Sequence, residues 1–299
     1  MDAVTHVHER LATGAHDRIA VRRTDDDWLE QHWADPDTRV LVVAGSRILP
    51  TEQGVDWIPA GEAPEGTRVL LGEREDTAYF AVIVPAAVAT EEWVPLRAVL
   101  SRLPDGEAPL VLHAIGVAEW LWATRFCARC GGPVRVVKAG HELVCDNGHQ
   151  TFPRTDPAVI MLVTAGEPGS ADERCLLGHQ ARWPAARFST LAGFSEPGES
   201  LEDAVRREVA EETGIHVGEV TYFGNQAWPL PASLMLGFTA RALDMDVMVD
   251  QEEISDARWF TRAELAEQAQ AGTISLPGNV SISRSLIEDW YGGALPGSW

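Results

Sequence analysis

Glutamates recur between Gly193 and Ile215 at a spacing that brings carboxylates together. Glu208, Glu211 and Glu212 lie three and four residues apart, so a helix would gather them on one patch of its surface. Glu208 and Glu212 fall inside the arc of apolar residues, with Glu211 at its edge. A buried carboxylate costs several kcal/mol unless it is paired or binds a metal. The nearby Arg207 cannot neutralise three carboxylates, so this spacing predicts a divalent cation held by oxygen ligands.

Signals for the two ends of this helix flank the glutamates. Ser200 and Asp203 form an S-x-x-D start that resembles a capping box, and Gly214 stands where a helix ends in the left-handed conformation. Pro197 and Gly198 lie in the loop that precedes the helix. The alternative, a set of ordinary glutamates on a solvated face, would place the carboxylates opposite the apolar stripe and not within it.

The same stretch resembles a known signature, the Nudix box. The matching positions are Gly193, Glu199, Arg207, Glu208, Val209, Glu211, Glu212, Gly214 and Ile215. The resemblance implies a hydrolase that depends on magnesium or manganese and cleaves a nucleoside diphosphate linked to another group. It also implies an α-β-α sandwich in which the helix follows a loop and carries the metal. The box alone does not name the substrate.

Composition and charge restrict the class of protein. The chain has 299 residues, 45% of them hydrophobic and 23% charged, which is typical of a soluble globular protein with room for two domains. A net charge of −21 argues against broad binding of nucleic acid or anionic membranes, because no basic field attracts phosphate groups. Lys138 is the only lysine, so an anionic substrate would have to be held by metal, arginines and backbone amides.

No stretch of the sequence resembles a signal peptide or a membrane span. The most apolar run, Leu110 to Trp122, is interrupted by His113 and Glu119 and is too short to cross a bilayer. Four cysteines in such a chain favour metal binding in a reducing compartment over disulfides. We therefore expect a cytoplasmic protein.

The first 125 residues mix strand-like and helical patterns. Helices are expected at 26–33, 93–103 and 110–125, and strands at 39–44, 68–71 and 78–84. No internal repeat and no group of residues that indicates chemistry stands out in this region. Its tryptophans are expected in a core or at an interface.

Residues 126–152 carry the spacing of a metal-binding segment. Cys127 and Cys130 form a C-x-x-C-G knuckle, and Cys145 follows at a distance typical of zinc ribbons. Gly148 stands where a fourth cysteine is expected, and His149 beside it could complete a Cys3His site. Structural zinc is the prediction. The alternatives are a ribbon held by packing alone and a redox dithiol at Cys127 and Cys130.

The remainder of the chain has the pattern of a second α/β domain. Strands are expected at 158–164, 174–178, 217–224, 233–243 and 257–260, and helices at 262–271 and 281–290, while 189–192 leads into the box. Cys175 lies in a strand-like run and is expected to be a buried hydrophobe. The predicted fold class is α+β: an N-terminal mixed α/β domain over 1–125, a short zinc ribbon over 126–152, and a C-terminal Nudix α-β-α sandwich over 153–299.

Three features narrow the resemblance to the NADH pyrophosphatase subfamily. The segment 225–233 is similar to the S-Q-P-W-P-F-P-x-S motif that follows the box there, with departures at Asn225, Ala227 and Leu230. A zinc knuckle just before the Nudix domain is that subfamily's layout. Residues 253–259 and 281–288 are similar to its C-terminal pattern.

Carried over residue by residue, this resemblance implies a metal site. Glu208, Glu212 and Glu253 would hold Mg²⁺ or Mn²⁺ together with the backbone carbonyl of Ala192. Glu211 would be a further ligand or would orient the attacking water. Arg207 would pair with Glu208, and Glu199 completes the catalytic candidates.

The resemblance also implies a substrate pocket. Phe194 and Phe152 would sandwich the nicotinamide ring, the second aromatic coming from the partner subunit, which implies a homodimer. The rest of the nucleotide pocket would be lined by Gln226, Trp228, Pro229, Pro231, Ser233 and Ser283.

The predicted reaction is hydrolysis of the pyrophosphate bond of NAD(H) to NMN(H) and AMP. Removal of an NAD cap from RNA breaks the same bond in a larger substrate. NAD-capped RNA is the second candidate substrate, because the negative net charge disfavours binding of RNA. One alternative is a Nudix hydrolase of ADP-ribose or another nucleoside diphosphate derivative, which the departures at Ala227 and Leu230 keep open. The other is a binding module without turnover, which the retained glutamates of the box disfavour.

Overall fold

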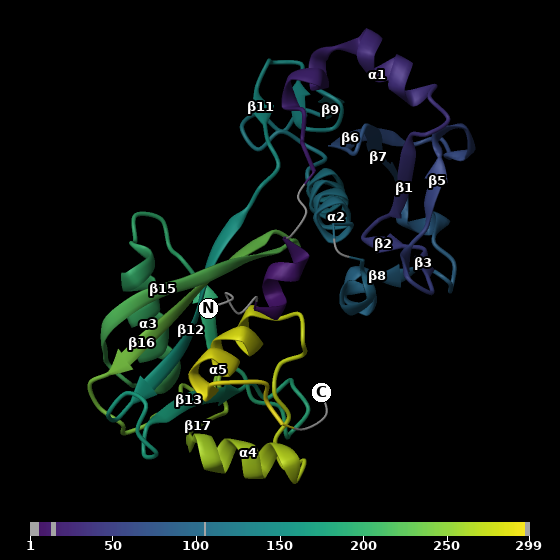
Figure 1. Ribbon diagram of the computed structural model, residues 1–299. Coiled ribbons are helices and arrows are strands. Elements are labelled where there is room, and N and C mark those ends of the chain that lie inside the picture. The colour runs from purple at the N-terminus through teal and green to yellow at the C-terminus, as the bar shows by residue number, and fades with distance from the viewer. Residues whose placement is uncertain (1–5, 13–15, 105, 297–299) are drawn as a thin grey trace. The chain divides into compact units, whose positions relative to one another are not determined.

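The computed structural model describes residues 6–12, 16–104 and 106–296, and its chain divides into two compact units (Figure 1). One unit holds residues 10–12, 16–104, 106–155 and 227–233, and we call it the N-terminal unit. The other holds residues 6–9, 156–226 and 234–296, and we call it the Nudix unit. The zinc-ribbon segment therefore groups with the N-terminal unit.

The N-terminal unit is built on a six-stranded sheet with one long helix packed on it (Figure 1). Its strands are β1 (Arg39–Ala44), β2 (Arg47–Ile48), β5 (Trp57–Pro59), β6 (Thr67–Arg74), β7 (Thr77–Val84) and β8 (Val94–Pro95), with a small ladder of β3 (Pro50–Thr51) and β4 (Gly54–Val55). Its α-helices are α1 (Asp26–Trp33) and α2 (Ala108–Ala123). β1, β6 and β7 follow the three predicted strands closely, and both α-helices were predicted. The short strands β2, β3, β4, β5 and β8 were not predicted.

Short 3-10 turns connect these elements. They are η2 (Ala20–Thr24), η3 (Ala60–Glu62), η4 (Ala86–Val88), η5 (Leu96–Ala98) and η6 (Leu100–Arg102), and η1 (Val7–Leu11) lies at the start of the described chain. The helix predicted over 93–103 is wrong, because this stretch forms β8 followed by η5 and η6. Pro95 pairs with Arg47 at the sheet edge, and the buried side chains of Leu96 and Val99 are placed by 3-10 turns instead.

The zinc-ribbon segment forms its own three-stranded sheet. Its strands, in the order β11-β10-β9, are β9 (Val134–Val137), β10 (Glu142–Cys145) and β11 (Gln150–Thr151). β10 lies between its two neighbours and pairs antiparallel with both. This small sheet holds Cys145 at the end of its central strand.

The Nudix unit has a second six-stranded sheet between helices. Its strands are β12 (Asp156–Ala165), β13 (Arg174–His179), β14 (Leu191–Phe194), β15 (Val217–Trp228), β16 (Ser233–Ala242) and β17 (Asp256–Thr261). Its helices are α3 (Leu201–Thr213), α4 (Arg262–Gln270) and α5 (Ile282–Tyr291). Alternate residues of β12 point to two separate cores, one closed by α3 and the other by α4 and α5. The predicted sandwich is confirmed.

The two large sheets have the same strand order. The N-terminal unit has β6-β7-β1-β2-β8 with β5 also paired to β1, and the Nudix unit has β15-β16-β12-β13-β17 with β14 also paired to β12. Each strand of one sheet therefore has a counterpart in the other, in the same order along the chain. The sequence showed no internal repeat, and that interpretation is wrong at the level of topology.

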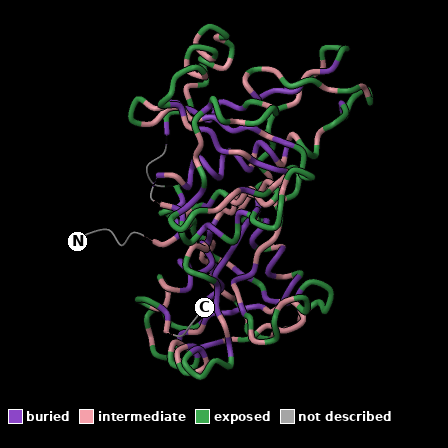
Figure 2. Tube along the Cα trace, turned by 90° about the vertical axis from the view of Figure 1, so that its right-hand side faces the viewer, coloured by how far each residue is buried: buried purple, intermediate pink, exposed green. Residues whose placement is uncertain are grey.

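Burial follows the strands in both units (Figure 2). Cys175 is fully buried in β13, as predicted. Among the described residues, no helix is long and apolar enough to cross a membrane.

Candidate active site

Helix α3 begins and ends at the predicted signals. The backbone N–H of Asp203 donates to the Ser200 hydroxyl oxygen at 3.2 Å, and Gly214 adopts a left-handed φ of 72°. The Asp203 carboxylate accepts from the Ser200 hydroxyl at 2.9 Å, so only half of the capping box is formed. Ala204, Val205 and Val209 pack into the core, which fixes the face that the helix buries.

Two glutamates lie on this buried face. Glu208 is 8% exposed and Glu212 is 2% exposed, whereas the Glu211 side chain is 62% exposed. Neither carboxylate oxygen of Glu212 has a hydrogen-bond partner among the residues that the structure describes. Burial, followed by the charges of Glu208, Glu253, Asp250 and Glu211, raises the pKa of Glu212 to about 8. A buried acid with two unpartnered oxygens fits the ligand set of a hard divalent cation.

Arg207 organises the other carboxylates. Its guanidinium donates to both oxygens of Glu199 at 2.8 and 2.9 Å, and this pairing lowers the pKa of Glu199 to about 2. The same group donates to Glu208 at 2.9 Å and to Glu211 at 3.0 Å, and to the backbone oxygen of Phe194 at 2.9 Å. Arg207 thus ties the loop before α3 to the helix. It does not reach Glu212, which is left as the uncompensated carboxylate.

Burial also acts on Glu208. It raises the pKa of Glu208 even though Arg207 acts in the opposite direction. A side chain at position 193 would collide with this carboxylate, since a Cβ there would lie 1.9 Å from Glu208 Cδ. Gly193 in β14 is therefore required for Glu208 to lie where it does. Ala192, the predicted carbonyl ligand, is its neighbour in β14 and pairs with Ile160.

Glu253 lies on a tight turn that the sequence did not reveal. The Asp250 carboxylate accepts from the backbone N–H groups of Glu252, Glu253 and Ile254 at 2.9–3.3 Å. This turn brings the charges of Asp250 and Glu253 close enough to raise the pKa of Glu212. The signal that could have found Asp250 is its position three residues before Glu253 in a D-x-x-E pattern.

Two of the predicted pocket residues use their polar groups within the protein. The Gln226 side chain donates to Val280 O at 2.6 Å and accepts from Ile282 N at 3.0 Å. The Ser283 hydroxyl is bonded to Thr190 Oγ1 at 2.7 Å and to Ser189 Oγ at 2.9 Å. These contacts anchor the start of α5 to β15 and to the approach to β14. Sequence reasoning missed Ser189 and Thr190.

The remaining pocket candidates are distributed over both units. Phe194, 57% exposed, belongs to the Nudix unit, and Phe152, 55% exposed, belongs to the N-terminal unit. Trp228 lies under the Arg97 guanidinium at 5.6 Å, and a Cβ at Gly116 would lie 3.2 Å from Pro229. Pro231 and Ser233 lie in the same turn, 227–233, which groups with the N-terminal unit. The exposure of both phenylalanines leaves each ring free to stack on a planar ligand.

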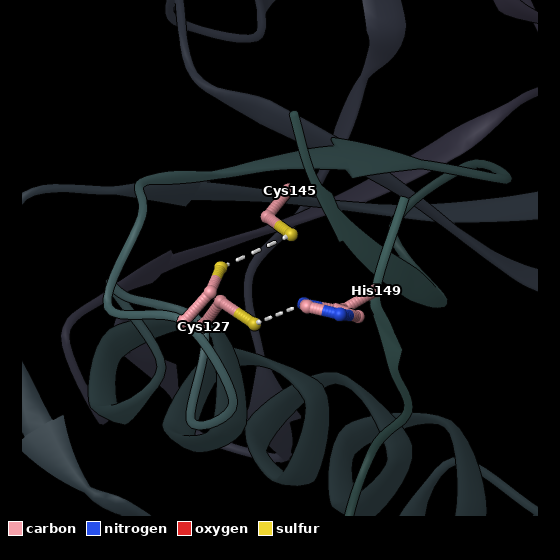
Figure 3. A group of neighbouring side chains, drawn as sticks. Cys127, Cys145 and His149 are labelled. Carbon is pink, nitrogen blue, oxygen red and sulfur yellow. Dashed lines mark hydrogen bonds between the residues drawn. The ribbon is translucent and has the colours of Figure 1, made fainter. Parts of the chain in front are cut away.

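The zinc-ribbon cysteines come together as a second cluster (Figure 3). Ligand atoms of Cys127, Cys130, Cys145 and His149 all lie within 4.8 Å of one another, the one such group among the described residues. Cys130 and Cys145 sulfurs are 3.7 Å apart, and Cys127 Sγ is 3.5 Å from His149 Nδ1. Tetrahedral zinc with Zn–S bonds of about 2.3 Å would separate its sulfurs by about 3.8 Å. The cluster therefore fits a structural zinc ion.

The missing fourth cysteine has a structural explanation. Gly148 has a φ of 76°, a conformation that a cysteine at this position would adopt only with strain. His149 follows it, and its backbone oxygen accepts from Cys145 N at 3.1 Å, which closes the second knuckle. Backbone and side-chain hydrogen bonds, first that of Gly132, lower the pKa of the Cys130 thiol to about 6, which favours the thiolate that binds metal.

Comparison with known families accounts for nearly the whole chain. Residues 154–276 match the NUDIX domain, residues 123–152 the NADH pyrophosphatase zinc ribbon domain, and residues 25–120 the NADH pyrophosphatase-like rudimentary NUDIX domain. The NAD-capped RNA hydrolase NudC of Mycobacterium tuberculosis is 37% identical over 297 residues, covering 92% of each chain. The NAD-capped RNA hydrolase NUDT12 of Homo sapiens is 35% identical over 286 residues, covering 88% of this chain. The chain spans 59% of that human relative's length.

Proposed function

Since the chain belongs to the NADH pyrophosphatase subfamily of the Nudix hydrolases, we propose that it hydrolyses the pyrophosphate bond of NAD(H) to NMN(H) and AMP. The observation that carries the proposal is the pair of buried glutamates, Glu208 and Glu212, with the two unpartnered oxygens of Glu212. A binding module without turnover would have no use for this costly arrangement.

The substrate includes, in our proposal, NAD-capped RNA. Both relatives carry this activity in their names, and the bond that is broken is the same. The net charge of −21 gives no general attraction for an RNA backbone, so recognition would be centred on the cap. Because Ala227 and Leu230 depart from the subfamily motif, ADP-ribose is the alternative substrate to test beside NAD(H).

Glu208, Glu212 and Glu253 would hold the divalent ions, with Ala192 O as a backbone ligand. Bound Mg²⁺ or Mn²⁺ would lower the pKa of water and neutralise charge on the two phosphates. Arg207 fixes Glu208 and Glu211 through one guanidinium, so the carboxylates are oriented before substrate arrives. The exposed Glu211 can serve as a ligand or orient the attacking water, and Glu199 keeps Arg207 in place through its paired hydrogen bonds.

Phe194 and Phe152 would clamp the nicotinamide ring. Both rings are more than half exposed, which suits aromatic stacking with a flat ligand. We propose that Phe152 is supplied by the partner subunit of a homodimer, and that the residues of the turn 227–233, together with Gln226 and Ser283, line the rest of the pocket. Cysteines arranged as zinc ligands suit a reducing compartment, which supports a cytoplasmic location.

Product analysis tests the proposed reaction. NADH, NAD, ADP-ribose and NAD-capped RNA would each be incubated with the protein and Mg²⁺ or Mn²⁺, and the products separated by chromatography. NMN(H) with AMP from the dinucleotide, or NMN with 5′-phosphorylated RNA from the capped RNA, is expected. Cleavage of ADP-ribose alone would replace this proposal by the ADP-ribose alternative.

Elemental analysis tests the zinc. Protein purified without chelator should contain about one zinc ion per chain in addition to any activating metal, because the four ligands match a closed tetrahedral site. Cys127→Ser should lose the zinc and lower Tm, whereas Cys175→Ala should keep it, because Cys175 lies in β13 of the other unit. An unchanged Tm together with absent zinc would mean a ribbon held by packing alone.

A further inference from the structure

A cavity of about 290 Å³ lies in the N-terminal unit, at the carboxyl ends of its two parallel strands. β1 and β7 run parallel and finish side by side at Ala44 and Val84. The turn after β1 and the segment after β7 form two walls of the cavity, and α2 forms the third. In open α/β sheets, ligands bind at this end of parallel strands.

Small residues keep this cavity open. Ala86 and Ala89 face it from the segment after β7, and Gly45 from the turn after β1. A Cβ at Gly45 would lie 2.9 Å from the Ala86 Cβ, and Gly45 has a φ of 64°. A residue larger than glycine is therefore excluded at position 45, and no side chain from this position fills the cavity.

Two opposite charges line the cavity without pairing with each other. Arg47 Nη1 donates to the backbone oxygen of Trp93 at 3.1 Å, which fixes the guanidinium and leaves its other N–H groups available. Glu119 forms no ion pair or hydrogen bond among the residues that the structure describes. A ligand with an anionic group and a hydrogen-bond donor could satisfy both.

An exposed tryptophan completes the lining. Trp122 is 58% exposed, in contrast to Trp120, which is 5% exposed on the same helix. Glu119 and Trp122 lie three residues apart in α2 and so share one face of the helix. The cavity thus offers an indole ring beside a carboxylate, which suits a planar ring that is electron-poor or carries amino groups.

We propose that this cavity is a binding site for a mononucleotide with a single-ring base, a pyridine or a pyrimidine. The base would stack on Trp122, its amide or amino group would donate to Glu119, and the phosphate would bind Arg47. The volume is at the lower end for ligand pockets, which suits a mononucleotide better than an intact dinucleotide. The site is separate from the hydrolytic site, and the proposal does not depend on the proposed reaction.

Fluorine NMR tests this site directly. The full chain would be labelled with 5-fluorotryptophan, the Trp122 resonance assigned by its absence in Trp122→Phe, and NMN, CMP or inorganic phosphate titrated in. NMN and CMP should shift the Trp122 resonance in a saturable way, and phosphate alone should bind more weakly. The shift should persist in Glu212→Gln and Phe194→Ala, which separates this site from the Nudix unit.

Variants of the lining residues then give the expected losses by calorimetry. Trp122→Ala should weaken binding of NMN about 10- to 100-fold, Trp122→Phe should retain most of it, and Arg47→Gln should weaken it about tenfold or more. Arg102→Gln, an exposed arginine of the same unit outside the cavity, is the matched control and should change nothing. A Trp122 resonance that millimolar NMN and CMP do not move, or that moves only with protein concentration, would overturn the proposal.

Discussion

The two large sheets of this chain share one strand order, yet the carboxylate site that we describe lies on only one of them. In the Nudix unit, β14 is followed by the thirteen-residue helix α3. At the corresponding place in the N-terminal unit, β5 is followed by the three-residue turn η3, and β6 begins at Thr67. The helix that carries Glu208 and Glu212 is therefore missing from the N-terminal sheet.

The strand before the helix differs in the same way. Gly193 pairs with Val159 one position before the end of the β12–β14 ladder, and Ile58 pairs with Val40 at the matching position of the β1–β5 ladder. Gly193 is needed because Glu208 lies against it, whereas the strand that holds Ile58 is followed by the turn η3. The sheet therefore serves as a scaffold, and one loop and one helix convert it into a site.

The largest expected effect follows from removing the charge that α3 buries. Glu212→Gln should lower kcat/KM for NADH by roughly three decades or more, because the proposed metal site loses a ligand. Glu202→Gln, on the exposed side of the same helix, is the matched control and should be fully active. Full activity of Glu212→Gln would refute the metal assignment and remove the contrast between the two sheets.

The next effect concerns the glycine that receives Glu208. Gly193→Ala should lower kcat/KM about 100-fold, since a Cβ placed 1.9 Å from Glu208 Cδ must displace a carboxylate that Arg207 also holds. Gly61→Ala, in the turn that replaces α3 in the N-terminal unit, meets no atom within 4 Å and should change neither activity nor Tm. Equal activities of the two variants would contradict the role given to Gly193.

Features with a local cause could be predicted from the sequence, and features made by distant contacts could not. The caps Ser200 and Gly214 and the apolar stripe of α3 act within a few residues, and the structure confirms them. The partners of Arg207 include Glu199, eight residues away, and the shared strand order exists only in the pairing of strands. The helix predicted over 93–103 is wrong because apolar residues at helical spacing, such as the buried Leu96 and Val99, also suit 3-10 turns beside Pro95.

Removing one ring of the clamp proposed for the nicotinamide should lower kcat/KM for NADH by about one to two decades. Phe194→Ala should lower kcat/KM for NADH about 10- to 100-fold and leave that for ADP-ribose nearly unchanged, because ADP-ribose has no base at that end. Phe152→Ala should act in the same way, and mixed dimers with Glu212→Gln should regain activity if the clamp is shared between subunits. Equal losses on both substrates would mean that these phenylalanines do not contact the nicotinamide.

The smallest expected effect is on stability, which should change with pH in opposite directions in the two units. Burial, the leading cause, lowers the pKa of His16 and His141 to about 4 and that of His113 to about 2. The His16 and His113 rings are linked by a 3.4 Å contact, and Arg18 and Arg23 oppose protonation of this group. In the folded N-terminal unit these three histidines stay unprotonated as the pH falls from 7 to 5. In the unfolded chain the same histidines bind protons below about pH 6.5. The stability of this unit should therefore fall, by up to about 2 kcal/mol per histidine at pH 5.

The Nudix unit without divalent metal should respond the other way. The pKa of Glu212 is raised to about 8, so above pH 8 its buried carboxylate is charged and destabilises the folded unit fully. This destabilisation decreases as the pH falls toward about 4.5, the pKa of the same carboxyl in the unfolded chain. Hydrogen exchange, corrected for its intrinsic pH dependence, should show protection falling in β1 and β7 and rising in β12 and β16 between pH 8 and 5. His113→Phe should weaken the pH dependence of protection in β1 and β7, and Glu212→Gln should weaken that in β12 and β16. A change in stability that is the same at every pH does not affect this comparison. Parallel trends in both sheets, unaltered by either substitution, would show that neither buried group sets the pH response.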